Sequence, residues 1–245
     1  MAFVFELRGV IRRYGTAVAL GPVDLTIEEA STTALIGPSG AGKSTLLRML
    51  NGLVPADAGQ VLFRGQPLIE SELPALRRRI GYVVQGGGLF PHLDAAGNAA
   101  LVARYLGWDE PRIATRLNEL AELVRLPGSV LSRFPAQLSG GQAQRVGLMR
   151  ALMLDPEVLL FDEPLGALDP VTRFDLQGDL RDAFTRLRKT VVLVTHDLPE
   201  AAFLAERAVL MRDGRVVQQG PVRELASAPA DAFVERFVHA SRIFP

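Results

Sequence analysis

An eight-residue segment, GPSGAGKS at residues 37–44, limits what this chain can fold into more than any other feature of its sequence. It fits the pattern G-x-x-x-x-G-K-[ST], in which glycines let backbone N–H groups turn toward a phosphate. The apolar residues 34–36 precede it, and a helical pattern at residues 46–50 follows it. A helix that begins at such a loop adds its partial positive charge to the attraction for an anion. We therefore interpret the segment as a phosphate-binding loop between a strand and a helix, and not as a chance glycine turn.

Two side chains in this loop are suited to nucleotide chemistry. Lys43 would supply a full positive charge to the β- and γ-phosphates, and the Ser44 hydroxyl would bind Mg²⁺. The residues of the segment that we expect to contact the nucleotide are Gly37, Pro38, Ser39, Gly40, Ala41, Gly42, Lys43, Ser44 and Thr45.

The composition excludes several kinds of protein. Basic and acidic residues number 27 each, so the formal net charge is zero and no bulk basicity indicates a nucleic-acid partner. The 245 residues include no cysteine, which excludes disulfides and thiolate metal sites. No run of 18 uninterrupted apolar residues occurs, so no helix is expected to span a bilayer. If the protein works at a membrane, another chain must hold it there.

The order of the apolar patterns predicts one α/β domain over residues 1–245. Residues 4–14 and 23–29 indicate two strands, with a turn expected at Gly21-Pro22. Residues 94–133 show helical spacing and no strand signal, which indicates a helical subdomain inserted into the α/β core. A hairpin that turns at Asp213-Gly214 is expected over residues 209–219, with two short helices after it. The expected boundaries are 3–93 and 156–240 for the core with its β subdomain, and 94–155 for the helical subdomain.

Polar residues follow the apolar strands at the points where those strands end. The phosphate-binding loop follows residues 34–36, and Gln85 follows residues 80–84. Asp162-Glu163 follows residues 158–161, and Thr195-His196 follows residues 191–194. Parallel strands bring their carboxyl ends to one edge of a sheet, where ligands of open α/β sheets bind. The sequence therefore predicts that these groups gather along one edge.

The acidic pair suggests two separate roles. Adjacent strand residues point to opposite faces, so Asp162 and Glu163 are not expected to do the same work. Asp162 suits an oxygen ligand of Mg²⁺, and Glu163 suits a general base that orients the attacking water. By itself, the same pair also fits an acidic turn before Pro164.

Two further residues fit the same chemistry. His196 would contact the γ-phosphate and hold the water in line, although a lone histidine after a strand is also typical of a structural residue. Gln85 would place its amide oxygen on Mg²⁺ or on the water, although it also fits an ordinary polar loop. We expect the catalytic residues to be Lys43, Gln85, Glu163 and His196, and the metal ligands to be Ser44, Gln85 and Asp162.

The sequence LSGGQ at residues 138–142 opens another helical pattern. Ser139 and Gln142 fit a capping box, which satisfies the first N–H groups of a helix. A cap alone does not need the pair Gly140-Gly141, which is costly at a helix start. Two glycines bare backbone N–H groups, which suits a second anion contact.

Taken together, these motifs resemble those of the ATP-binding cassette (ABC) ATPases. GPSGAGKS, Gln85, LSGGQ, VLLFDEP, GALD at residues 166–169 and His196 occur in the order typical of that family, over nearly the whole chain. The resemblance implies an ABC-type P-loop NTPase core with a mostly parallel sheet, an N-terminal antiparallel β subdomain and an inserted α-helical subdomain. It implies ATP hydrolysis, with ATP and Mg²⁺ as cofactors.

The same resemblance implies a head-to-tail homodimer or pseudo-dimer, with each ATP between the phosphate loop of one copy and LSGGQ of the other. Tyr14 is similar to the aromatic residue that stacks on adenine in this family, and it also fits a half-buried strand position. The implied contacts to the partner's nucleotide are Ser139, Gly140, Gly141, Gln142 and Asp169.

Further segments, RRRIGYVVQ, GLFPH, LGW, GALDP and VVQQG, are similar to those of bacterial importer ATPases for osmoprotectants such as glycine betaine, choline or another quaternary amine. This implies integral membrane permease subunits as partners, indirectly a solute-binding protein, and a peripheral location at the cytoplasmic face of the membrane. The coupling surface is expected at residues 86–97. There Phe90 and Leu93 either fill a groove of the partner or pack inside the helical insert, and three glycines are expected to give the backbone freedom.

Other functions are weighed against this interpretation. An importer for amino acids or another small solute is the main alternative within transport. Soluble ABC ATPases that act on DNA or ribosomes usually carry long coiled-coil insertions, zinc sites or tandem cassettes, which this sequence lacks. A regulatory module without turnover would lack the base or LSGGQ, and both are present here.

Overall fold

The computed structural model describes residues 2–166 and 168–241, and close backbone contacts divide the chain into two compact units. The first unit comprises the described parts of Met1–Arg77 and Arg188–Pro245. The second comprises the described part of Arg78–Leu187. Within the described residues, no helix is both long and apolar enough to cross a membrane.

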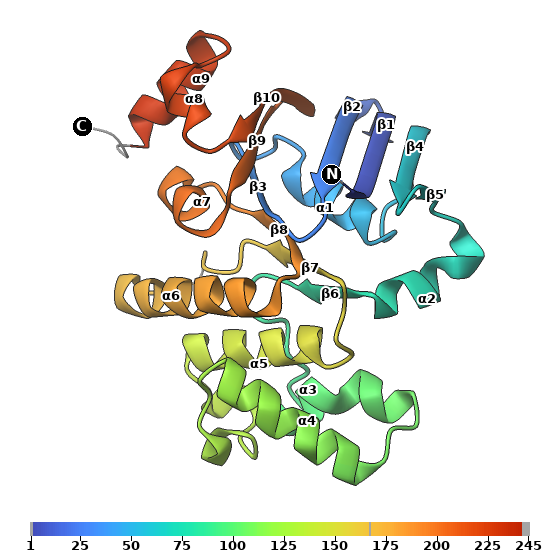
Figure 1. Cartoon of the computed structure of the whole chain (residues 1–245), viewed down its shortest axis with the longest axis vertical. Helices are drawn as coiled ribbons and strands as arrows, with labels where there is room; N and C mark the ends of the chain where they lie inside the picture. Colours follow the sequence, from blue (N-terminus) through green and yellow to red (C-terminus); the bar gives the residue numbers. More distant parts are fainter. Residues whose placement is uncertain (1, 167, 242–245) are drawn as a thin grey trace. The chain divides into compact units, whose positions relative to one another are not determined.

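The first unit contains an antiparallel sheet in the order β2-β1-β4-β5 and a second group of strands in the order β10-β9-β3-β8 (Figure 1). In the second group, β3 pairs in parallel with both β8 and β9, and β9 pairs antiparallel with β10. Every residue of β3 and β8 is buried, as expected of parallel strands covered on both faces. The elements are β1 (Phe3–Tyr14), β2 (Ala17–Glu28), β3 (Thr32–Ile36), α1 (Lys43–Leu50), β4 (Ala58–Phe63), β5 (Gln66–Pro67), α2 (Leu73–Arg78), β8 (Thr190–Val194), α7 (Leu198–Leu204), β9 (Arg207–Arg212), β10 (Arg215–Pro221), α8 (Glu224–Ser227) and α9 (Ala232–Ala240).

The first two strands turn at residues 15–16, so the turn expected at Gly21-Pro22 was wrong. Gly21-Pro22 lies inside β2 and has a cis peptide bond. Pro22 has no partner in the register of β1 and β2, which shifts between the pairs Val10–Val23 and Arg12–Leu20, so a proline is tolerated there. A Cβ on Gly21 would come within 2.8 Å of the Ile11 side chain on β1, so this glycine serves close strand packing and not a chain reversal.

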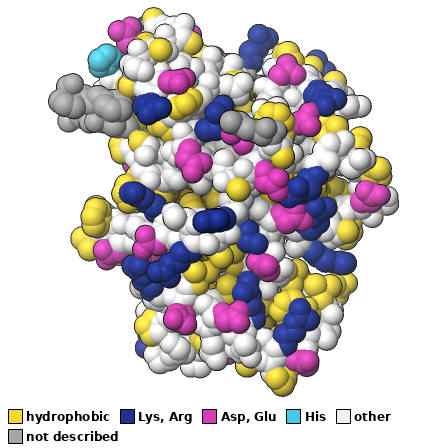
Figure 2. Space-filling model, in the orientation of Figure 1, with side chains coloured by type: hydrophobic (Ala, Val, Ile, Leu, Met, Phe, Trp, Pro, Cys, Tyr) yellow, Lys and Arg dark blue, Asp and Glu magenta, His cyan; other side chains and the backbone are white. Residues whose placement is uncertain are grey.

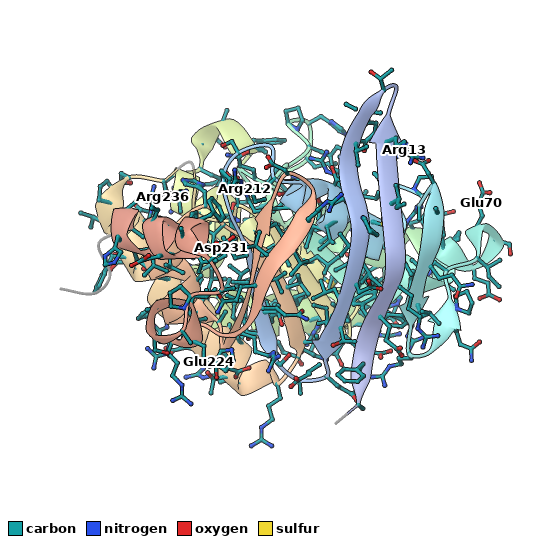
Figure 3. The ribbon with its side chains drawn as sticks, turned by 90° about the horizontal axis from the view of Figure 1, so that it is seen from above. Arg13, Glu70, Arg212, Glu224, Asp231 and Arg236 are labelled. Atoms are coloured by element: carbon teal, nitrogen blue, oxygen red, sulfur yellow. The ribbon has the colours of Figure 1, made fainter. Side chains whose placement is uncertain are left out.

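The end of the first unit agrees with the sequence. Strands β9 and β10 form the expected hairpin, with Asp213-Gly214 between Arg212 and Arg215, which pair across it. The two short helices that were expected after it are α8 and α9. The labelled Arg212 and Asp231 in Figure 3 belong to β9 and to the start of α9.

The second unit pairs two parallel strands with helices. Strand β6 (Ile80–Val83) pairs with β7 (Val158–Asp162). Helices α3, α4 and α5 pack on one another, and α5 also contacts α6 and β6 (Figure 1). The helix α4 buries Ile113, Leu117 and Leu120 along one face, as expected of an amphipathic helix. The helices are α3 (Ala95–Tyr105), α4 (Glu110–Leu123), α5 (Gly140–Leu152) and α6 (Pro170–Leu187).

These elements confirm the expected α/β class, with mostly parallel strands, an antiparallel N-terminal sheet and a helical insertion. The boundaries between the two compact units fall at other residues than the boundaries expected for the subdomains. The expected helical subdomain, residues 94–155, lies inside the second unit, which also contains β6, β7 and α6. The subdomain boundaries at residues 93–94 and 155–156 stay a prediction.

Candidate functional site

The phosphate-binding loop leaves β3 after Ile36 and enters α1 at Lys43. The Lys43 side chain is only 6% exposed, and its Nζ donates hydrogen bonds to the carbonyls of Gly37 at 2.8 Å and Pro38 at 2.9 Å. The Ala41 N–H closes the curve by donating to the Pro38 carbonyl at 3.2 Å. The loop is therefore wrapped around its own lysine, and the contact of Lys43 with phosphates stays a prediction.

Backbone from other strands surrounds this loop, which explains its glycines. Gly37 has a φ of 141°, and a Cβ there would lie 2.2 Å from the Met211 carbonyl oxygen of β9. Gly42 has a φ of 96°, and a Cβ there would lie 2.6 Å from the Ala19 carbonyl oxygen of β2. A side chain at either position would meet rigid backbone as well as an unfavourable φ.

The N-terminus of α1 is suited to an anion. Its N-cap, Gly42, provides no side-chain hydrogen bond, and no acidic residue stands in the first turn. The first N–H groups of a helix have no intrahelical partner, and negative charge is favourable beside them. A phosphate at this position would satisfy those N–H groups.

His196 lies at the same sheet edge as the loop. Strand β8 runs parallel to β3, and the Thr195 N–H donates to the Leu35 carbonyl at 3.1 Å. Thr195 is buried and donates its hydroxyl to a Glu200 carboxylate oxygen at 2.9 Å, while His196 is exposed. The first unit therefore brings the loop and His196 to neighbouring strand ends, and the role of His196 stays a prediction.

Tyr14 ends β1 on the hairpin whose other strand touches the loop at Ala19. Figure 3 labels the preceding residue, Arg13, toward one end of this hairpin. The Tyr14 ring is 50% exposed, and the Arg12 guanidinium lies 4.9 Å from its centroid. A half-exposed ring that already stacks with a cation is compatible with both interpretations of Tyr14, so adenine stacking stays a prediction.

In the second unit, Gln85 and Glu163 lie close together beside Gly166, which the sequence analysis named only as part of the GALD motif. A Cβ on Gly166 would lie 3.4 Å from Gln85 Nε2 and also 3.4 Å from Glu163 Oε2. The parallel pairing of β6 with β7 explains this approach, because Gln85 follows one strand and Glu163 follows the other. Gly166 keeps the space between the two polar side chains open.

The acidic pair is separated by a turn and not by strand alternation. Asp162 is the last residue of β7, whereas Glu163 lies past the strand with a φ of 48°. The expected reason for their different directions was therefore wrong, although the two residues do differ in environment. A non-glycine residue in the left-handed region is uncommon and is typical of turns and functional sites.

Asp162 is 7% exposed, and its carboxylate accepts a hydrogen bond from the Tyr82 hydroxyl at 3.2 Å. Sequence reasoning assigned no role to Tyr82, which lies on β6. Its position in a strand parallel to β7 was a usable signal, because Tyr82 pairs with Leu160, two residues before Asp162. A hydroxyl at this distance helps to orient the carboxylate.

The LSGGQ segment forms the capping box that its sequence predicts. The Ser139 hydroxyl accepts from the Gln142 N–H at 3.2 Å, and the Gln142 side chain accepts from the Ser139 N–H at 3.1 Å. A Cβ on Gly141 would lie 2.7 Å from the Thr172 methyl group, and one on Gly140 would lie 3.0 Å from the Leu168 side chain. These glycines therefore let α5 begin tightly against the start of α6.

Asp169 caps α6 beside the LSGGQ segment. Its carboxylate accepts from the N–H groups of Thr172 at 3.0 Å and Val171 at 3.2 Å. The Thr172 side chain, followed by these N–H groups, holds the pKa of Asp169 below its ordinary value. A cavity of about 240 Å³ lies next to these residues, lined by Ser139, Gly141 and Thr172 among others. Together, Ser139, Gly140, Gly141, Gln142 and Asp169 form one corner of the second unit.

The oxygen ligands expected for Mg²⁺ fit a metal that arrives with a nucleotide. Across residues 2–166 and 168–241, no three His, Asp or Glu side chains form a group able to hold a metal. Magnesium in nucleotide sites usually keeps one or two carboxylates and completes its shell with phosphates and water. Ser44, Gln85 and Asp162 supply only oxygen donors of this kind, of which Asp162 is a buried carboxylate.

Comparison with known proteins points in the same direction. The sequence model described as "ABC transporter" matches residues 20–166. The glycine betaine uptake system ATP-binding protein YehX of Escherichia coli is 46% identical over 98% of this chain and 78% of its own length. The glycine betaine/carnitine/choline transport ATP-binding protein OpuCA of Bacillus subtilis is 42% identical over 98% of this chain, which spans 63% of that protein.

A relative with a different described solute has the same sequence identity. The Fe(3+) ions import ATP-binding protein FbpC of Streptomyces coelicolor is 46% identical over 96% of this chain and 67% of its own length. Among solved structures, the dimeric cassette MJ0796 is 34% identical with a TM-score of 0.81, over 89% of this chain and 99% of that one. A post-hydrolysis state of the same cassette with ADP and Pi has a TM-score of 0.79.

Proposed function

This chain belongs to the ABC transporter family, and we propose that it is the ATPase subunit that powers import of an osmoprotectant through separate membrane permease subunits. The single observation that carries the ATPase assignment is the phosphate loop, which is wrapped around Lys43 and enclosed by backbone of β2 and β9. Relatives described as glycine betaine and choline transport proteins support the solute class. The proposed solutes are glycine betaine, choline or another quaternary amine.

The residues of this chain divide the work of hydrolysis. The loop N–H groups and Lys43 bind the phosphates and stabilise the charge that develops on them. Glu163 accepts a proton from the attacking water, with Gln85 beside it to hold that water, and His196 fixes the γ-phosphate. Ser44, Gln85 and Asp162 would hold Mg²⁺, which would neutralise charge on the phosphate oxygens when bound.

We propose that two copies close around two ATP molecules. Similarity to a dimeric cassette supports the pairing. In such a dimer Ser139, Gly141 and Asp169 of one copy would contact the nucleotide site of the other. Each γ-phosphate then satisfies donors from both chains, and its release after hydrolysis removes a contact that favours the closed state. Opening and closing would be passed to the permease at the cytoplasmic face of the membrane.

An importer ATPase for a different small solute is the second candidate. The specific observation is the 46% identity to a relative described as an Fe(3+) ions import protein, which equals the identity to YehX. An ATPase subunit that does not touch the solute needs no solute pocket. ATPase subunits of importers for different solutes can therefore have similar sequences.

Reconstitution would test both. The chain would be assembled with permease and solute-binding subunits of an osmoprotectant importer from the same organism, in vesicles loaded with ATP and Mg²⁺. We expect uptake of radiolabelled glycine betaine or choline that needs internal ATP and is lost with Lys43→Ala. Uptake of ferric ion or an amino acid alone would favour the second candidate. If the complex assembled with the wild-type chain did not hydrolyse ATP, the ATPase proposal would be contradicted.

A further inference from the structure

The glycine segment after Gln85 is held in place by a side chain from α5. Arg150 donates hydrogen bonds to the Gly87 carbonyl at 2.7 Å and to the Gly88 carbonyl at 2.9 Å. Gly86, Gly87 and Gly88 have φ values of 69°, 77° and 53°, which favour glycine. These glycines allow a left-handed turn whose carbonyls Arg150 binds, and the expectation that they give the backbone freedom stays a prediction.

The same turn lies directly on the backbone of α5. A Cβ on Gly147 would lie 3.1 Å from the Gly87 Cα and 3.2 Å from its carbonyl oxygen. A Cβ on Gly87 would lie 2.9 Å from the Ala143 carbonyl oxygen. Glycine on both sides lets the two backbones approach, and Arg150 holds them at that distance.

The far end of the segment is held separately. Asn98, on α3, is completely buried, and its Oδ1 accepts from the Phe90 N–H at 2.7 Å. Its Nδ2 donates to the carbonyls of Phe90 at 3.1 Å and Leu93 at 2.9 Å. The segment from Gln85 to Leu93 is thus bound at one end to α5 and at the other to α3. Of the two residues expected to face a partner, Phe90 is 43% exposed and Leu93 is partly buried.

Arginine is the side chain that this geometry needs. A guanidinium is a planar group with several N–H donors, so it can bond two neighbouring carbonyls at once. A lysine ammonium is a single point and cannot reproduce that fork. Burial lowers the pKa of Arg150, and an arginine still keeps its charge at neutral pH. In the sequence, the only signal for this role was a basic residue in an otherwise buried stretch of helix.

We propose that Arg150 is a positioning residue that makes the Gln85 segment and the LSGGQ helix move as one body. Helix α5 begins at the LSGGQ corner and ends near Arg150, so a shift at Ser139 is carried along the helix to the turn that follows Gln85. Its benefit to catalysis rests on the proposed function, since it assumes that Gln85 and LSGGQ both contact nucleotide. The mechanical link itself rests only on the contacts within the second unit.

Hydrogen exchange of the full-length protein tests the link without any assumption about function. We expect Arg150→Met to raise exchange of the amides at residues 84–90 by at least about tenfold, while those at residues 146–152 stay unchanged. Arg150→Lys should fall between Met and wild type. The matched control is Arg116→Lys, because Arg116 also donates to a carbonyl of α5, that of Leu152 at 3.0 Å, without touching the glycine turn. The control should leave exchange at residues 84–90 unchanged.

Kinetics of the same variants test the positioning role. We expect Arg150→Met to lower kcat for ATP about five- to tenfold with KM for ATP within about twofold, since the phosphate loop is untouched. Arg116→Lys should match wild type in both. If Arg150→Met does not fold, Gly147→Ala replaces it, because the added Cβ would push Gly87 away while Arg150 stays in place.

Each result decides a separate claim. Unchanged exchange at residues 84–90 in Arg150→Met would overturn the link. Faster exchange with an unchanged kcat would overturn the positioning role. A wild-type protein without ATPase activity would contradict the proposed function, and the exchange experiment would still decide the link.

Discussion

The phosphate loop in the first unit and the Gln85–Glu163 region in the second are built on different principles. The loop binds its own lysine and is enclosed by backbone, with Met211 and Ala19 carbonyls at two glycines. The second region depends on side chains: Gln85 and Glu163 meet beside Gly166, and Arg150 holds the turn after Gln85. A site made of backbone tolerates little change but needs few partners, whereas a site made of side chains needs a supporting residue for each group.

The largest effect should come from the base in the second region. We expect Glu163→Gln to lower kcat for ATP hydrolysis by about 10²- to 10⁴-fold, because an amide does not accept the proton of the attacking water. ATP binding should persist, since the phosphate loop is unaltered, and light scattering should show an ATP-dependent dimer. Normal turnover in this variant would remove Glu163 from the proposed role and leave the second region without a base.

Next in size is the loss of charge from the first region. Lys43→Ala should weaken ATP binding about 10- to 100-fold, which corresponds to loss of a charge-assisted hydrogen bond to phosphate. Equilibrium binding of a fluorescent ATP analogue measures it, and circular dichroism checks that the fold is retained. Undiminished affinity would show that the loop backbone alone holds the nucleotide, and the contrast between the two regions would become sharper still.

A matched pair of glycine variants separates the cost of a clash with the surrounding backbone from the cost of a positive φ. Gly37→Ala should destabilise the protein by more than about 2 kcal/mol, because its Cβ would lie 2.2 Å from the Met211 carbonyl oxygen at a φ of 141°. Gly40→Ala also has a positive φ, 80°, but its Cβ would have no atom within 4 Å, so we expect about 1 kcal/mol. Urea unfolding compares them. Equal losses would mean that the enclosing backbone yields easily, contrary to our description.

The smallest effect concerns a single carboxylate in the second region. Asp169 has a lowered pKa because of the Thr172 side chain and then the N–H groups of Thr172 and Val171, so Thr172→Val should raise it. A lowered folded-state pKa gives stability that is present above the unfolded-state pKa and is lost as pH falls through the folded-state pKa. The variant should lose this contribution at a higher pH. Carbon-13 NMR titration of the carboxyl group measures the midpoint, and an unchanged midpoint would mean that the hydroxyl is not a donor to Asp169.

Most of the first region could be predicted from the sequence. A short motif defines the loop because its requirements are local: glycines for backbone conformation, and a lysine at the helix start. The strands around residues 34–36 and 191–194 were also recognisable, because continuous apolar runs are typical of covered parallel strands. The turn at Gly21-Pro22 was wrong because the same dipeptide serves equally in an edge strand, and only pairing with β1 decides between the two.

Less of the second region could be predicted. Gln85, Asp162 and Glu163 were found by their positions after strands, but the positive φ of Glu163 depends on the turn into Gly166. The Tyr82 hydroxyl bond could be found only by aligning two parallel strands, and no spacing rule reports the Arg150 contacts, which join residues far apart in sequence. The close approach of Gly87 to Gly147 on α5 depends on the fold, so the run of glycines by itself did not predict it. The absence of bulk basicity followed directly from the net charge of zero. On the face drawn in Figure 2, basic and acidic side chains are interspersed.

One carbonyl that encloses the phosphate loop, that of Ala19, comes shortly before it in the sequence, and another, that of Met211, comes about 170 residues after it, which has a consequence for how the protein is made. During synthesis, residues 37–44 leave the ribosome long before β9 and the turn at Gly214, whose N–H donates to the Ala41 carbonyl at 3.3 Å. Folding of nascent chains proceeds by whole units as they are completed. A nascent chain should therefore become able to retain nucleotide only after residue 214 has emerged, so shorter fragments would not compete with longer chains for ATP.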